Sequence, residues 1–204
     1  MSRLTTLMAS LLLFCFITAS AQTTFDSPTP AFTQKDTSYW IYNFRQFRDA
    51  VYQHDIAKAR VYIDFPILDE SNEIWFLAYG ANEKALEKLP DEAKPFTEKD
   101  FRQYFSRLFP PYFIKTLLKV KTDELLKRSE YETVSLVDST ESTSYIMYVN
   151  WDKAENSLVL NLAATGIPGG SEGEDEQTME FNIIYLFDVT AKGHLKLKAI
   201  KMAG

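Results

Sequence analysis

A serine flanked by glycines is the most suggestive chemical motif in this sequence. Residues 169–173 read GGSEG and match the G-x-S-x-G nucleophile elbow, and Asp188 and His194 follow in the order of a hydrolase triad. That elbow requires a helix after Ser171, whereas here an acidic stretch leads into an alternating segment typical of a strand. If 178–188 form one strand, the serine and the histidine lie about 30 Å apart, far beyond hydrogen-bond reach. We therefore expect no catalytic triad.

Metal-binding patterns are also incomplete. The sequence has two histidines, His54 and His194, and neither is followed three or four residues later by a histidine or carboxylate on a helix face. Residues 69–73, DESNE, begin like a calcium-binding loop. However, position six is Ile74 rather than glycine, and position twelve is Gly80 rather than glutamate. We expect no metal ion and no cofactor.

General acid–base chemistry is the one catalytic option that the sequence leaves open. Tyr62 and Asp64 lie close together in the chain, and a pocket that desolvates the carboxylate would raise its pKa toward a useful range. Trp75, Trp151 and Tyr185 are candidate walls of the same pocket. The competing interpretation is structural, with Asp64 as a turn or cap residue and the aromatic residues as ordinary core.

The elements that would position these residues begin with two helices. Trp40, Phe44, Phe47 and Val51 form a single apolar stripe at helical spacing. Asp55 is a candidate N-cap for a second, short helix that ends before Pro66. Residues 73–80, EIWFLAYG, are aromatic-rich, and we predict a strand there.

Further helices precede a run of strands. Thr97 and Asp100 form a capping-box pattern at the start of a helix that Pro110 ends, and helical pieces continue to residue 128. From residue 131 the period is two, and we predict five antiparallel strands. They are expected at 131–137, 143–151, 157–166, 179–189 and 195–202. In the last of them, leucines and lysines alternate, which predicts one covered face and one exposed face.

Two aromatic motifs link this order of elements to a known superfold. The first reads F…FR.AV…D…FP and the second FT..DF..Y…F. They comprise Phe44-Arg45, Phe47-Arg48, Ala50-Val51, Asp55 and Phe65-Pro66, then Phe96-Thr97, Asp100-Phe101, Tyr104 and Phe109. On these motifs residues 39–204 resemble the nuclear-transport-factor-2-like (cystatin-like) superfold, and secreted bacterial domains within it. The resemblance implies an α+β fold with N-terminal helices packed on a curved antiparallel sheet (cone-shaped, cystatin-like), and a pocket at its open end.

The beginning of the chain is typical of an exported protein. Residues 1–21 combine Arg3, a short apolar segment and a small-x-small cleavage site, so we predict a cleaved signal peptide and a periplasmic or secreted protein. Residues 22–38 are predicted to be a linker or loosely docked arm, and 39–204 a single domain. The only cysteine, Cys15, lies in the signal. After cleavage we expect no membrane insertion, because no second long apolar run exists.

The charge balance restricts the partners. The chain carries 22 basic and 28 acidic residues, for a net charge of −6, and removal of residues 1–21 takes away one arginine and no acid. Nucleic acid requires a basic face, so we expect no nucleic-acid partner. The acidic residues of segment 172–176 are interpreted as a solvated loop, with loose calcium binding as the alternative.

Two functions from different classes fit these observations. The favoured one is a non-enzymatic binding or interaction module whose pocket or sheet face takes a small apolar molecule, a peptide or a protein. The alternative is a metal-independent enzyme of the isomerase or dehydratase type. A third option is a cone filled by its own aromatic residues, with function on the outer sheet face. We also expect a homodimer through an apolar patch on that face. The patch consists of Ile146, Tyr148, Ile184, Leu186 and Ile200.

Overall fold

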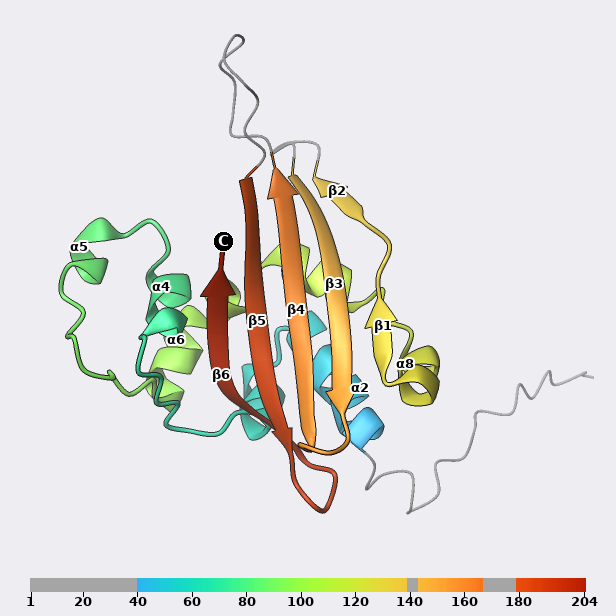
Figure 1. Ribbon diagram of the computed structural model, residues 1–204. Helices are drawn as coiled ribbons and strands as arrows, with labels where there is room; N and C mark the ends of the chain where they lie inside the picture. The colour runs from blue at the N-terminus through green and yellow to red at the C-terminus, as the bar shows by residue number, and fades with distance from the viewer. Residues whose placement is uncertain (1–39, 139–142, 167–178) are drawn as a thin grey trace, which may run out of the picture. The chain divides into compact units, whose positions relative to one another are not determined.

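The computed structural model describes residues 40–138, 143–166 and 179–204. The predicted signal peptide, the arm 22–38 and the GGSEG segment lie outside these ranges. Within them, seven α-helices and a six-stranded, curved, unclosed antiparallel sheet confirm the predicted α+β fold with helices packed on a sheet. In Figure 1 the sheet faces the viewer, and the helices lie behind it or beside its two edges.

The first two helices form as predicted. Helix α2 (Trp40–Tyr52) buries its apolar stripe, and the carboxylate of Asp55 accepts a hydrogen bond from the backbone N–H of Lys58 at 3.0 Å to cap α3 (Ile56–Ala59). A 3₁₀ turn, Arg60–Tyr62, follows α3. The buried stripe of α2 consists of Trp40, Phe44, Phe47 and Val51. These aromatic side chains therefore belong to the core.

Residues 73–79 are helical, so the strand predicted at 73–80 is wrong. Helix α4 (Glu73–Tyr79) starts where the carboxylate of Asp69 accepts a hydrogen bond from the N–H of Glu73 at 2.9 Å, and it ends at Gly80, whose φ is +55°. Aromatic residues favour strands only weakly, because burial against neighbours decides the outcome. The residues that α4 buries are Ile74, Trp75 and Ala78, which recur at helical spacing.

Four more helices lead to the sheet. They are α5 (Glu83–Leu86), α6 (Glu98–Leu108), α7 (Pro111–Leu117) and α8 (Thr122–Arg128). The predicted capping box at the start of α6 is confirmed. The backbone N–H of Thr97 donates to Oδ2 of Asp100 at 2.9 Å, and the N–H of Asp100 donates to Oγ1 of Thr97 at 3.4 Å.

The sheet has β4 as its middle strand. The strands are β1 (Glu130–Glu132), β2 (Leu136–Asp138), β3 (Thr143–Asp152), β4 (Ser157–Gly166), β5 (Met179–Val189) and β6 (Leu195–Ala203). Their order is β1-β3-β4-β5-β6, and β2 also pairs with β3. The strand predicted at 131–137 is divided, because Oγ1 of Thr133 accepts a hydrogen bond from the N–H of Met147 at 2.9 Å and interrupts the ladder.

A β-bulge in β6 changes which residues face the core. The pairing of β6 with β5 passes from Leu197 directly to Ala199, so Lys198 has no partner on β5. Because successive side chains alternate between faces, one extra residue reverses the pattern beyond it. Ile200 is consequently buried completely, and the prediction that it lies on the outer sheet face is wrong.

Candidate functional site

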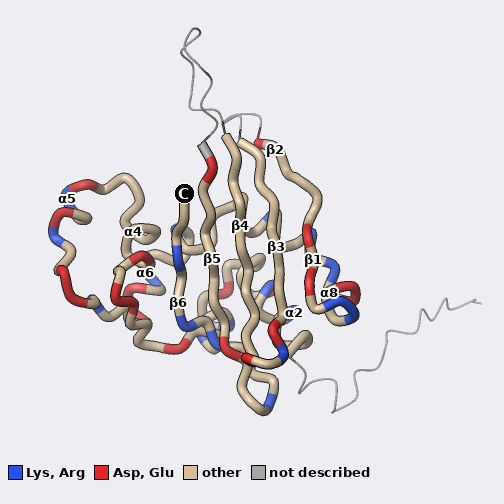
Figure 2. The backbone as a smooth tube through the Cα atoms, in the orientation of Figure 1, with Lys and Arg blue, Asp and Glu red and all other residues tan. Residues whose placement is uncertain are grey.

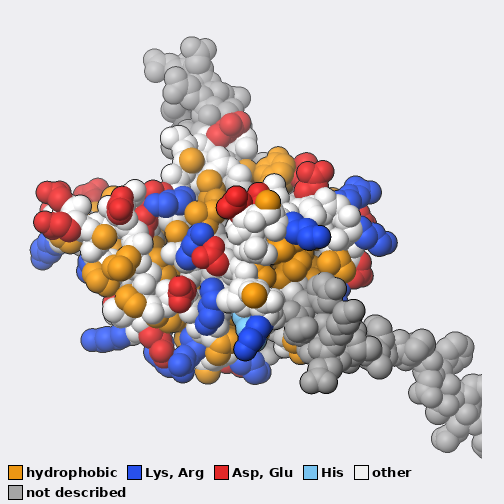
Figure 3. Space-filling view, turned by 60° about the horizontal axis from the view of Figure 1, so that its bottom comes forward, with side chains coloured by type: hydrophobic (Ala, Val, Ile, Leu, Met, Phe, Trp, Pro, Cys, Tyr) orange, Lys and Arg blue, Asp and Glu red, His pale blue; other side chains and the backbone are white. Residues whose placement is uncertain are grey.

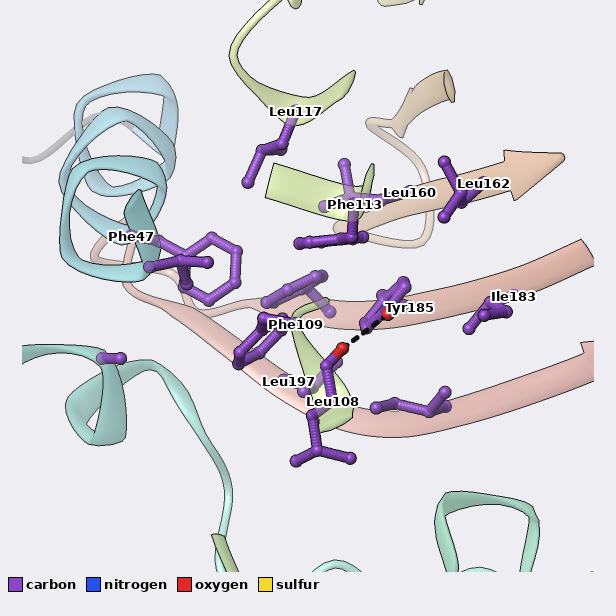
Figure 4. Packing of buried hydrophobic residues seen from close by; sticks show 14 of the residues in the cluster. Phe47, Leu108, Phe109, Phe113, Leu117, Leu160, Leu162, Ile183, Tyr185 and Leu197 are labelled. Atoms are coloured by element: carbon purple, nitrogen blue, oxygen red, sulfur yellow. Dashed lines mark hydrogen bonds between the residues drawn. The ribbon is translucent and has the colours of Figure 1, made fainter. Parts of the chain in front are cut away.

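Aromatic rings occupy the space between the helices and the sheet (Figure 4). The ring of Phe109 lies 5.7 Å from Phe47 of α2, 5.4 Å from Phe113 of α7 and 6.0 Å from Tyr185 of β5, measured between centroids. Phe187 of β5 lies 5.1 Å from Phe47. All five rings are buried completely. The protein's own side chains therefore fill this part of the interior, where the superfold resemblance implied a pocket.

Tyr185 has a structural bond inside this cluster. Its hydroxyl donates a hydrogen bond to the backbone carbonyl of Leu108 at 2.7 Å, drawn as the dashed line in Figure 4. This bond joins the middle of β5 to the last residue of α6. Complete burial raises the pKa of the Tyr185 phenol well above its usual value, because the charged phenolate would be desolvated. The phenol stays protonated and acts as a hydrogen-bond donor to the Leu108 carbonyl.

Replacement of Tyr185 by phenylalanine tests this assignment. We expect Tyr185→Phe to lower the free energy of unfolding by about 1–3 kcal/mol at neutral pH, since it leaves the Leu108 carbonyl without this donor. In the wild type, the unfolded phenol ionises above a pH of about 10 while the folded phenol keeps its proton, so stability falls as pH rises there. The variant should show a shallower fall. Urea unfolding at pH 8 to 11 measures both effects, and an unchanged alkaline slope would contradict the assignment.

Tyr62 and Asp64 do not form an acid–base pair in the described residues. The Tyr62 ring packs edge-on against Phe47 at 5.8 Å, and partial burial raises the pKa of its phenol. The side chain of Asp64 is exposed, and its backbone N–H donates to the carbonyl of Leu197 at 3.0 Å, beside the edge of β6. Tyr62 thus packs at the rim of the core. The backbone of Asp64 covers the edge of β6.

The two candidate tryptophans lie in separate places. Trp151 of β3 stacks on Trp40 at 4.7 Å, where α2 begins. The indole N–H of Trp75 donates to the carbonyl of Lys94 at 2.8 Å, and the Lys94 ammonium lies 3.8 Å from the Trp75 ring centroid. That ammonium also donates to the hydroxyl of Tyr79 at 2.6 Å. The five candidate residues therefore occupy distinct neighbourhoods rather than one site.

Sequence reasoning missed an ion pair beside α4 in which the carboxylate is buried and the lysine is partly exposed. The side chain of Asp69 is 2% exposed, and it bonds the ammonium of Lys201 from β6 in addition to the backbone N–H of Glu73. Glu73 lies 3.5 Å from the same ammonium, and its carboxylate accepts the backbone N–H of Met202. The hydrogen bond to Asp69 raises the pKa of Lys201. This network ties α4 to β6, and the separation of 132 positions between Asp69 and Lys201 hides it from sequence patterns.

The outer face of the sheet carries apolar and uncharged polar residues at its centre. One row across it runs from Tyr148 through Asn161 and Ile184 to Lys201. The flanking residues form two further rows: Ile146, Ala163, Asn182 and Asn150, Val159, Leu186, Ala199. All of them are half-buried except Asn150, which is exposed. Figure 2 shows that β4 and the middle of β3 and β5 carry no charged residue, whereas charges mark β1, α8 and β6. In Figure 1 no described helix crosses this face.

An open groove adjoins this face at the β1 edge. Its volume is about 550 Å³. It is lined by Glu124 and Arg128 of α8, Glu130, Tyr131 and Glu132 of β1, and Tyr148, Val149 and Asn150 of β3. Three carboxylates against one guanidinium make the groove acidic. Charged side chains of both signs, with apolar side chains between them, also cover the end of the molecule drawn in Figure 3.

The described residues offer no metal site and no membrane-spanning helix. Among the described residues, no group of three or more histidine, cysteine or carboxylate side chains could hold a metal ion. None of the described helices has the length and apolar character needed to cross a membrane. A scan against protein-family models found no matching model, and searches of curated proteins and of solved structures found no match. The geometry of the outer face and its groove therefore carries the functional argument.

Proposed function

We propose that this protein is a non-enzymatic interaction module, exported by its first 21 residues, that binds another protein surface through the outer face of its sheet. One observation carries the proposal: rings from α2, α7 and β5 fill the space between helices and sheet, while no described helix crosses the outer face, whose centre carries no charged residue. Apolar residues gathered on one face are a feature of protein-binding surfaces. The proposal keeps the binding class favoured by the sequence, and of its two possible locations, pocket or sheet face, it takes the sheet face.

The catalytic alternative receives less support. It requires a carboxylate beside a tyrosine or histidine within a pocket. The phenol of Tyr185 is bonded to a backbone carbonyl, the side chain of Asp64 is exposed, and the buried carboxylate of Asp69 is paired with Lys201. Tyr185 and Asp69 are therefore held by bonds within the fold, and Asp64 faces solvent.

Native mass spectrometry of the protein purified from its own host tests the proposal. We expect the same mass per chain before and after mild denaturation, because the protein's own rings occupy the space between α2, α7 and β5. A small molecule that is present in the native protein and lost on denaturation would overturn the proposal. It would restore the carrier or pocket-enzyme interpretation and identify the chemical class of the ligand.

A further inference from the structure

The fold covers one edge of the sheet with its own chain. At the β6 edge the backbone N–H of Asp64 donates to the carbonyl of Leu197 at 3.0 Å, and Ile63 forms a parallel bridge with Leu197. Farther along the same strand, the carboxylate of Glu73 accepts the backbone N–H of Met202. Backbone groups that face away from β5 therefore have partners at two places on this edge, and a strand from another protein would have to displace them.

The β1 edge has no such cover among the described residues. The carbonyl of Ser129 accepts a hydrogen bond from the N–H of Trp151 of β3 at 2.7 Å, and the N–H of Thr133 donates to a carbonyl of β3 at 3.0 Å. Because backbone groups alternate in direction along an antiparallel strand, those of Glu130 and Glu132 point away from β3. No described residue bonds them on that side.

The acidic groove includes the residues that carry these free backbone groups. Its volume of about 550 Å³ is typical of clefts that bind ligands, which measure ~300–1,000 Å³. Residues of α8 line it together with all three residues of β1 and their neighbours on β3. β1 ends the strand path, and in Figure 1 α8 lies beside it. An extended chain in the groove would therefore lie next to the free edge of β1.

Two carboxylates on β1 specify the charge of such a chain. Glu130 pairs with Asn150 and Glu132 with Tyr148, so both carboxylates lie on the outer face, and both residues are exposed. Neither makes an ion pair with a described residue. Residues directly opposite on neighbouring strands share a face, with Cβ atoms about 4.5–5.5 Å apart. An added strand with lysine or arginine at positions i and i+2 would therefore complete two ion pairs.

The other charges of the groove keep this preference. Glu124 of α8 forms an ion pair with Lys121 at 3.5 Å. Arg128 is exposed and reduces the acidity of the groove, but three carboxylates still outnumber it. A second copy of this acidic chain is a poor partner for the edge, because paired β1 strands would place Glu130 and Glu132 against like charges.

We infer that the partner of this protein is an extended basic segment of another protein, which adds a strand to the free edge of β1 and occupies the acidic groove. The inference rests on the proposed function and adds the chemistry of the partner. The backbone of the segment bonds the outward N–H and C=O groups of Glu130 and Glu132, and this bonding gives affinity. Its two basic side chains contact the carboxylates of the same residues, and this contact gives specificity.

The pairing is short and has an apolar residue at its centre. Residues 133–135 oppose only residues 146 and 147 of β3, so the ladder is interrupted after Glu132 and the partner pairs along β1 alone. The residue between the two basic side chains points to the opposite face of the sheet, where Tyr131 is half-buried. The partner sequence is therefore basic–apolar–basic.

Fluorescence anisotropy with a labelled pentapeptide of sequence TKVKT tests the inference. We expect saturable binding that weakens as salt is raised. Glu130→Gln with Glu132→Gln should weaken binding about tenfold, since two ion pairs are lost. Glu83→Gln with Glu87→Gln is the matched control. These two glutamates of the α5 region are exposed and outside the groove, so the same change of charge should leave the affinity unchanged.

Backbone methylation of the peptide separates strand addition from general attraction of charge. One peptide is methylated at the lysine amide nitrogens and a second at the intervening ones, with the same side chains in both. Because alternate amides face β1, one peptide should bind at least about tenfold more weakly and the other should bind like the probe. Amide hydrogen exchange should slow at Glu130 and Glu132 when the probe binds, and change little at Thr133, which is already bonded to β3.

The outcomes distinguish this inference from the proposed function. A probe that fails to bind, or that binds Glu130→Gln with Glu132→Gln as tightly as the wild type, overturns the inference and leaves the outer face to another partner. Two methylated peptides of equal affinity would also overturn it. So would equal competition by cadaverine, a free diamine that has the charges without a backbone. A retained interior ligand in native mass spectrometry would overturn the proposed function itself.

Discussion

Replacement of Phe109 by alanine is expected to lower the free energy of unfolding by about 3–5 kcal/mol, a large part of the 5–15 kcal/mol that stabilises a typical domain. Phe109 is buried completely, and its ring lies 5.3 Å from Phe105, 5.4 Å from Phe113 and 6.0 Å from Tyr185. It follows the last residue of α6 and joins that helix to the rings of α7 and β5. Its removal leaves a cavity that these neighbours can fill only in part, because each is held by its own element.

The midpoint of urea unfolding at constant slope measures this loss. Phe76→Ala is the control, because Phe76 of α4 is the same residue type but is 43% exposed, and its loss should change stability by less than about 1 kcal/mol. If Phe109→Ala lowered the free energy of unfolding no more than Phe76→Ala does, the result would indicate free volume beside Phe109. An interior pocket would then regain support against surface binding.

Local signals in the sequence predicted the elements that have clear boundaries. The apolar stripe of α2, the Asp55 cap and the Thr97 capping box depend on residues within a turn or two of one another, and all three are confirmed. Residues 73–79 have two apolar patterns that compete. Their aromatic composition favours a strand, and the helix wins because Asp69 bonds the N–H of Glu73, the first residue of α4, and the N–H of Ser71 in the turn before it.

Positions that depend on distant contacts were not predictable. The bulge at Lys198 appears only in the pairing of β6 with β5, and it buried Ile200, which simple alternation had placed on the outer face. Of the predicted patch, Ile146, Tyr148, Ile184 and Leu186 do lie opposite the core, and Tyr148 is 42% exposed. The alternation of side chains between the two faces therefore predicted the correct face in strands that keep one pairing register throughout.

The aromatic residues proposed as pocket walls show a further limit. Sequence spacing indicated that Tyr185 faces the helices, and that direction is correct. Whether the facing rings enclose a void depends on how their volumes fit together, and this in turn depends on the helix crossing positions. Phe47 lies in α2, Phe109 directly follows α6 and Phe113 lies in α7, so no local pattern could reveal that Phe109 contacts Phe47 as well as Phe113. The contact of Phe109 with Tyr185 of β5 was equally hidden.

Replacement of Lys201 by methionine is expected to lower the free energy of unfolding by about 3 kcal/mol. Methionine keeps most of the aliphatic volume, so the loss comes from the carboxylate of Asp69, which is 2% exposed and would lack its cation. Two backbone N–H groups, from Ser71 and Glu73, still bond that carboxylate and limit the loss. Because the network joins α4 to β6, amide hydrogen exchange should accelerate in α4 before it accelerates in β4.

Lys198→Met provides the matched control on the same strand. Lys198 contacts Asp188 at 2.5 Å, yet both side chains are about half exposed, at 47% and 52%. An exposed pair contributes about 0–1 kcal/mol, so this variant should be nearly neutral for stability. The double variant Asp69→Asn with Lys201→Met should be more stable than Lys201→Met alone, because no buried charge then remains. If Lys201→Met and Lys198→Met changed the free energy of unfolding equally, burial of Asp69 would not strengthen its ion pair with Lys201. In that case, packing of α4 against β6 would hold this edge of the sheet without help from charge.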